Sequence, residues 1–330
     1  MSNLLLRLMR PLARLGESLA PGLTGRIAFR LFCTPPRPKQ GNHRAASVKS
    51  LAARLEAGKP LSVPFPCGSV AAHLFEPARS EERGTPPCVI LLHGWTGQAA
   101  VMAAFVQPLL DAGLRVVAFD LPAHGNSTGA TLDLPTGVAS LAAVARAVGP
   151  VEAIVAHSFG GSIALAALAG TLPAQPRVVA KRLVLIAPPS SMQEVARWFA
   201  GRIGLGPRGL RALEARIHAV AGMPVTAFAG AAQLQRYGGP TLLLHCQDDR
   251  EVPFAHAQAL TDAGPFVRLE ALSGLGHRRI LTAPRVTARV ADFVAGRAEP
   301  ALDQTQPISS RRTTASIAST PSGESFRQGR

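Results

Sequence analysis

Ala156-His157-Ser158-Phe159-Gly160-Gly161 is the stretch of sequence that decides the fold. An apolar run begins at Val151 and leads into it, and a second apolar run, 163–168, follows it. This pattern predicts a buried strand, a very tight turn and a buried helix, with Ser158 at the tip of the turn. The small residues two positions before and after the serine suit such a turn, because bulky side chains there would clash.

Other short apolar runs predict a sheet around this strand. They are separated by helix-like segments, which is the alternation typical of an α/β fold with a mostly parallel central sheet flanked by helices. A hairpin is expected within 61–77, around Cys67-Gly68-Ser69. The predicted strands are Cys88–His93, Arg115–Asp120, Val151–His157, Arg182–Ala187, Thr241–Cys246 and Val267–Leu272.

One connection is too long for a simple crossover between two strands. About 50 residues, roughly 189–239, separate the run that ends at Ala187 from the run that begins at Thr241, and they have helical content. A helical lid insertion over the carboxyl edge of the sheet is expected there. Helices that only pack on the domain are the alternative.

Charge divides the chain into three parts. The net charge is +15, of which residues 1–59 carry +9 and residues 60–296 only +4. We therefore expect a basic, partly helical N-terminal extension over 1–59, a main α/β domain over 60–296 and a disordered tail over 297–330, which has too few apolar residues to fold. No interleaving of basic and aromatic residues is present, so nucleic acid is not an expected partner.

The first 20 residues have an amphipathic pattern. On a helix, the arginines at 7, 10 and 14 lie opposite a leucine stripe, and Pro11 would bend the helix or begin a second one. Either the stripe packs on the domain, or the helix lies on an anionic membrane surface as a peripheral contact. The stripe consists of Leu5, Leu8, Leu12, Leu15 and Leu19.

Cysteine spacing and hydropathy bear on location. The four cysteines are Cys33, Cys67, Cys88 and Cys246, and they show no metal-binding or disulfide spacing. No apolar run approaches the roughly 18 residues that a membrane span needs. A cytoplasmic protein is expected, with membrane association through residues 1–20 as the alternative, and the oligomeric state is left open.

A serine hydroxyl needs a base to become nucleophilic, and the base is usually a histidine that a carboxylate holds in place. Groups at the carboxyl ends of parallel strands converge on one edge of the sheet. Asp249 follows the predicted strand 241–246, and His277 lies in a glycine-rich loop after the last strand. The alternatives are that Asp249 caps a helix beginning near Phe254 and that His277 is incidental to a surface turn.

The order Ser158, Asp249, His277 resembles that of the α/β-hydrolase-fold serine hydrolases, which include esterases, lipases and peptidases. Two further segments resemble the family's motifs: His93-Gly94-Trp95-Thr96-Gly97, its His-Gly oxyanion loop, and 120–127, its Asp-x-x-x-His-Gly-x-Ser segment. The resemblance covers roughly 61–296. Ala156 departs from it, since glycine is commoner there, but alanine is still small.

The resemblance implies a catalytic triad in which Ser158 attacks, His277 transfers the proton and Asp249 orients the histidine. It implies that the backbone N–H groups of Trp95 and Phe159 form the oxyanion hole. The supporting residues implied are His93, Gly94 and Gly160.

The expected activity is hydrolysis of a carboxylic ester or a related small-molecule acyl substrate, with no metal and no organic cofactor. The same triad could instead serve amide, thioester or carbon–carbon bond hydrolysis, or acyl transfer. A non-catalytic scaffold for binding or for a membrane surface is the alternative from another class.

Overall fold

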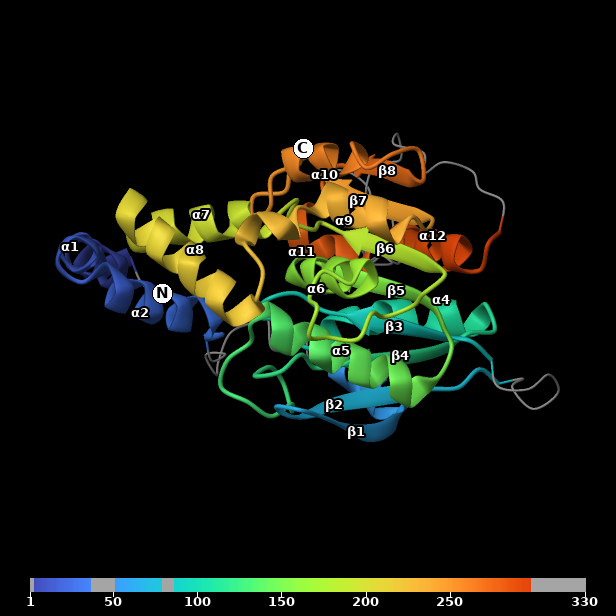
Figure 1. The fold of residues 1–330 in the computed structure, drawn as a ribbon. Coiled ribbons are helices and arrows are strands. Elements are labelled where there is room, and N and C mark those ends of the chain that lie inside the picture. Colours follow the sequence, from blue (N-terminus) through green and yellow to red (C-terminus); the bar gives the residue numbers. More distant parts are fainter. Residues whose placement is uncertain (1–2, 37–50, 79–85, 298–330) are drawn as a thin grey trace, which may run out of the picture.

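A computed structural model of the chain describes residues 3–36, 51–78 and 86–297, so the predicted tail from residue 298 onward lies outside the described residues. One sheet of eight strands forms the centre (Figure 1). The strands are β1 (Lys59–Phe65), β2 (Gly68–Phe75), β3 (Cys88–Leu92), β4 (Arg115–Phe119), β5 (Val151–His157), β6 (Arg182–Ile186), β7 (Thr241–Cys246) and β8 (Val267–Leu272).

The order of strands in the sheet is β1-β2-β4-β3-β5-β6-β7-β8. β2 pairs antiparallel with β1 and with β4, and every pair from β4 to β8 is parallel. The predicted mostly parallel sheet and its hairpin are therefore confirmed. Where a predicted strand was one residue too long, the extra residue, for example His93 or Asp120, already begins the loop at the carboxyl end.

Helices cover both faces of the sheet. α5 and α6 lie on one face, and α4 and α12 lie on the other (Figure 1). The helices are α1 (Asn3–Leu19), α2 (Pro21–Cys33), α4 (Val106–Asp111), α5 (Leu134–Val148), α6 (Phe159–Ala169), α7 (Met192–Ile203), α8 (Pro207–Ala221), α9 (Gly230–Tyr237), α10 (Ala255–Thr261), α11 (Gly276–Arg279) and α12 (Pro284–Val294), with 3₁₀ turns η1 (Ala99–Phe105), η2 (Val225–Phe228) and η3 (Ile280–Thr282).

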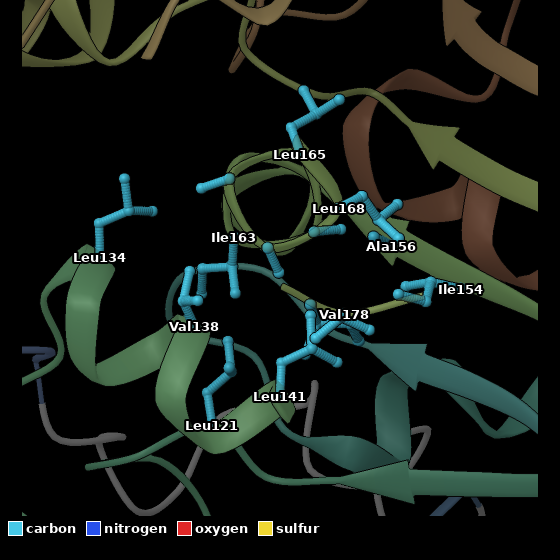
Figure 2. Close-up of a cluster of buried hydrophobic side chains, with 14 of the residues drawn as sticks. Leu121, Leu134, Val138, Leu141, Ile154, Ala156, Ile163, Leu165, Leu168 and Val178 are labelled. Carbon is cyan, nitrogen blue, oxygen red and sulfur yellow. The ribbon is translucent and has the colours of Figure 1, made fainter. Parts of the chain in front are cut away.

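Two apolar cores lie between these helices and the sheet. Successive side chains of a strand point to opposite faces, so Ile90 of β3 belongs to one core and Leu91 to the other. Figure 2 shows the first core, where Ile163 of α6 points toward Val138 of α5. The two helices meet closely, since a Cβ at Gly137 would lie 2.6 Å from the Ile163 Cδ1 atom. This packing fixes α6, and with it the turn at its start.

The long connection between β6 and β7 is helical, as expected, and contains α7, α8, η2 and α9. α9 packs against α6 and α10, two helices that contact strands of the sheet. α7 and α8 extend beyond the sheet, at the left of Figure 1. The action of this insertion as a lid stays a prediction.

The N-terminal extension contains two helices that pack on the insertion (Figure 1). α1 continues through Pro11 instead of ending there. α2 lies against α8 so closely that a Cβ at Gly25 would be 2.6 Å from the carbonyl oxygen of Ala212. The buried carboxylate of Glu17 accepts hydrogen bonds from the N–H groups of Gly206 (2.8 Å) and Gly209 (2.7 Å), at the start of α8.

The leucine stripe does not pack on the domain, so that interpretation is wrong for the leucines whose side chains are described. Leu12, Leu15 and Leu19 are all exposed, because α1 turns the opposite side, with Glu17, toward α8. Within 3–36, 51–78 and 86–297, no helix combines the length and the apolar character required to cross a membrane.

Candidate active site

Ser158 occupies a strained turn between β5 and α6. Its φ of +52° and ψ of −124° are sparsely populated for a residue with a side chain, and such a conformation costs about 1–3 kcal/mol. The turn is held from both sides: the Ser158 N–H donates to the carbonyl of Ile186 (2.9 Å), and the Gly161 N–H donates to the carbonyl of Ser158 (2.8 Å). The predicted strand, turn and helix are therefore present, and Ser158 lies at the carboxyl end of β5.

Two of the predicted supporting residues must be glycine for steric reasons. A Cβ at Gly94 would lie 2.7 Å from the Cβ of Ser158, and one at Gly160 would lie 2.5 Å from the carbonyl oxygen of His93. Real Cβ atoms do not approach other atoms so closely. The loop after β3 and the start of α6 thus meet backbone to backbone beside Ser158.

The structure brings Asp249 and His277 together. His277 Nδ1 and Asp249 Oδ2 are 2.8 Å apart, and the carboxylate of Asp249 is fully buried. The N–H groups of Glu251 (2.8 Å) and Val252 (2.9 Å) donate to the other oxygen, Oδ1. The alternative role as a cap of the helix at Phe254 is wrong, because α10 has no side-chain cap.

The hydrogen bonds also set the charge of Asp249. Burial alone would raise the pKa of its carboxyl group, but bonds from His245, His277 and the backbone of Val252 lower that pKa below its usual value. The carboxylate is therefore ionised at neutral pH. A buried anion beside Nδ1 favours the tautomer of His277 that carries its proton on Nδ1, which leaves Nε2 free to accept a proton.

Two further contacts join the loop of His277 to the loop of Asp249. Asp248 Oδ1 accepts a hydrogen bond from the N–H of Gly274 (2.9 Å). The guanidinium of Arg278 forms a two-pronged ion pair with Glu251 (2.7 and 2.9 Å). Together with the His277–Asp249 bond, these contacts fix the two loops relative to each other.

His157, the residue before Ser158, contacts His277 directly. Its Nε2–H donates to the backbone carbonyl of His277 (3.0 Å), and the two ring centroids are 4.6 Å apart. Burial lowers the pKa of His157 to about 3, so its ring is neutral and can donate in this way. Among the described residues, no hydrogen bond joins His277 to the Ser158 hydroxyl; such bonds are often long in an unliganded enzyme.

His245 is a site residue that sequence reasoning missed. Its Nε2–H donates to the carbonyl of Val252 (2.8 Å) and lies 3.5 Å from Asp249 Oδ2. The residue lies within the apolar strand β7, so its pattern indicated only a buried strand position. In the sequence, only its position four residues before Asp249 points to a role beside that carboxylate.

The predicted oxyanion loop lies next to the start of α6. The Trp95 and Phe159 rings meet edge to face, with centroids 5.9 Å apart. His93 holds the loop: its Nδ1–H donates to the carbonyl of Gly94 (2.7 Å), and its Nε2 accepts from the N–H of Leu121 (2.9 Å). Burial lowers the pKa of His93 to about 3, which keeps the ring neutral, as this pair of bonds requires.

The segment 120–127 braces this loop. Asp120 accepts hydrogen bonds from the N–H groups of Ala99 (2.7 Å) and Asn126 (2.8 Å), so both of its carboxylate oxygens are occupied by backbone donors. His124 Nε2 accepts from the Thr96 N–H (3.2 Å). Asp120 therefore orders a loop and lies apart from the His277–Asp249 pair.

Comparisons with known proteins agree with this geometry. Residues 89–290 match the model of the alpha/beta hydrolase family. No curated protein sequence matches the chain.

Many solved structures share the fold at low sequence identity. Est1E from Butyrivibrio proteoclasticus with bound ferulic acid is 19% identical (TM-score 0.54, covering 72% of this chain and 96% of that chain). A proline iminopeptidase from Mycobacterium smegmatis is 20% identical (TM-score 0.52, 72% and 98%). A membrane phospholipase A described as a bacterial virulence factor is also 20% identical (TM-score 0.53, 76% and 92%). At these identities the likeness shows the fold alone.

Proposed function

We propose that this chain, which belongs to the alpha/beta hydrolase family and is therefore a hydrolase, cleaves carboxylic esters or related acyl compounds. The proposed catalytic residues are Ser158, His277 and Asp249. The observation that carries this proposal is the 2.8 Å contact between His277 and the buried, ionised Asp249, in a structure that holds Ser158 in a strained turn. A serine, a histidine and a carboxylate in these roles are the parts that acyl transfer to water requires.

In the first half of the reaction, His277 Nε2 removes the proton of the Ser158 hydroxyl as the oxygen attacks the carbonyl carbon. The imidazolium that forms is stabilised by the carboxylate of Asp249, which remains ionised. His277 then gives the proton to the leaving alkoxide. An alcohol departs, and the acyl group stays bonded to Ser158.

In the second half, His277 takes a proton from a water molecule, which attacks the acyl carbon. The proton returns to Ser158, and the carboxylic acid leaves. Both tetrahedral intermediates carry a negative oxygen. The backbone N–H groups of Trp95 and Phe159 would donate to it, and losing one such donor typically costs about 3–4 kcal/mol of transition-state stabilisation.

A fluorophosphonate probe tests the nucleophile, because it bonds covalently to an activated serine. We expect labelling of the wild type and none of Ser158→Ala. The matched control is Ser162→Ala, which removes a buried hydroxyl from the same helix, α6. Equal labelling of wild type and Ser158→Ala, or no labelling of either, would overturn the proposal.

The ester specificity is tested separately. Purified wild type is assayed with p-nitrophenyl esters of increasing chain length and with aminoacyl anilides. Turnover of at least one ester that disappears in Ser158→Ala supports the proposal. Labelling by the probe with turnover of anilides alone would instead assign amide hydrolysis to the same triad.

A further inference from the structure

We propose that α1 and α2 form a docking surface for an anionic lipid bilayer. We define this lipid-facing surface by six exposed apolar side chains. Leu12 (68% exposed), Leu15 (58%) and Leu19 (75%) belong to α1, and Leu23 (59%), Ile27 (54%) and Leu31 (41%) belong to α2.

Exposed apolar residues are concentrated on this surface. Eight large apolar side chains are exposed in the described part of the chain, and six of them are those above. Their spacing is helical: Leu23, Ile27 and Leu31 recur every four residues, so they form one stripe along α2. Exposed apolar side chains gathered on two helices that contact each other mark an interaction site more often than scattered ones do.

The packing of the two helices keeps these stripes turned outward. α2 contacts α8 through its opposite face, where Gly25 and Ala28 are buried. α1 is attached through Glu17, whose carboxylate binds the start of α8. The inner faces of the helices thus hold them on the protein, with Phe32 of α2 also packed against Phe199 of α7 (ring centroids 5.0 Å apart), and the exposed leucines are left for an external partner.

The charge around the surface identifies that partner. Arg26 and Arg30 directly precede Ile27 and Leu31, so their guanidinium groups border the stripe. Residues 10–33 and 192–221, which form this end of the molecule (Figure 1), contain nine arginines, all exposed, against three glutamates, one of which is the buried Glu17. An apolar helix face bordered by arginines suits the interface of an anionic bilayer.

A second copy of the chain fits the surface poorly. If two copies met through the stripe of α2, Arg26 and Arg30 of each copy would be brought close to those of the other, without acidic partners. Like charges placed together in an interface cost several kcal/mol. Phosphate-bearing headgroups supply the missing negative charge.

Vesicle co-sedimentation with the full chain tests this inference. The vesicles contain phosphatidylglycerol in one arm and phosphatidylcholine alone in the other. The test variant is Leu23→Glu/Ile27→Glu. Val179→Glu is the control, because Val179 is an even more exposed apolar residue (79%) that lies before β6, outside the surface. Thermal unfolding checks that each variant is folded, and light scattering reports the oligomeric state.

We expect the wild type to bind the anionic vesicles at least about tenfold more tightly than the neutral ones. The affinity of the double variant for anionic vesicles should fall at least about tenfold, because burying one leucine-sized side chain in lipid strengthens binding by about that factor. Val179→Glu should bind like the wild type. No binding to anionic vesicles, equal binding by the double variant, or a dimer that the double variant dissociates would overturn the inference. Binding is measured without turnover, so this result is separate from the chemistry at Ser158.

Discussion

Gly94→Ala should impair the site while leaving the fold largely intact. The new Cβ would lie 2.7 Å from the Cβ of Ser158 and 3.0 Å from the carbonyl oxygen of His157. Carbon atoms in contact are normally about 3.5–4.0 Å apart, so the overlap is about 1 Å. Ser158 cannot yield easily, because its N–H is bonded to the carbonyl of Ile186 and it directly precedes α6. The loop after β3 must therefore move.

A displacement of this loop by about 1 Å would move the Trp95 N–H away from the reacting carbonyl, and a misplacement of that size can lower the rate about 100-fold. Crowding of a packed interior costs about 1–3 kcal/mol, which for a protein of this size lowers the Tm by roughly 1–5 °C. The assay is the second-order rate constant of labelling by the fluorophosphonate probe, together with thermal unfolding.

Gly201→Ala is the control for this substitution. Gly201 lies within α7, and no atom lies within 4 Å of the position of the new Cβ. We expect unchanged labelling and a stability equal to the wild type or up to about 1 kcal/mol higher. If Gly94→Ala is labelled within about twofold of the wild-type rate, the steric argument is refuted.

Three other changes have defined outcomes. Asp249→Asn should slow probe labelling about 10³–10⁴-fold, because asparagine cannot stabilise the imidazolium of the histidine. The control Asp248→Asn should be labelled at a rate within about tenfold of the wild type. Similar losses in both variants would contradict the assigned roles. His93 and His157 are neutral in the fold, because burial lowers their pKa values to about 3. Below the unfolded pKa of about 6.5 the unfolded chain takes up protons that the folded one does not. The free energy of unfolding is therefore unaffected above that pH and falls below it, by up to about 1.4 kcal/mol per pH unit for each histidine. Thermal unfolding measured from about pH 7 to about pH 5 should show a falling Tm, and the fall should be shallower in His157→Gln. If the Tm of the two proteins falls in parallel, the role assigned to His157 is contradicted. Glu17→Ala leaves two N–H groups of α8 without an acceptor, which should cost about 1–3 kcal/mol and speed trypsin cleavage in α1; an unchanged digestion rate would count against this anchor.

The strands could be predicted closely because local sequence specifies them. Val151–His157, Thr241–Cys246 and Val267–Leu272 match the structure to the residue. The first two are mostly apolar runs, which suit strands covered on both faces, and both strands are buried throughout. The pairing of Asp249 with His277 followed from topology, because both residues come after parallel strands that end at the same edge.

Other features depend on contacts that no local pattern contains. The leucine stripe of α1 was expected either on the domain or on lipid. Its described leucines do not pack on the domain, because Glu17 fixes the opposite side of the helix to α8. His245 looks like any residue of a buried strand until the loop that carries Asp249 folds back beside it. Proline in a helix interior normally bends or ends the helix, yet α1 continues through Pro11.

The bond from Glu17 to the start of α8 also has a consequence for the order of synthesis. The two partners, Glu17 and Gly206, are 189 residues apart in the chain. At about 5–20 residues per second, the ribosome needs about 10–40 s to make that interval. During this time α1 and α2 have neither their anchor on α8 nor a cover for their inner faces. In that interval the nascent chain carries α1 and α2, each with an uncovered apolar face, and a bilayer or a chaperone can meet them before α8 is made.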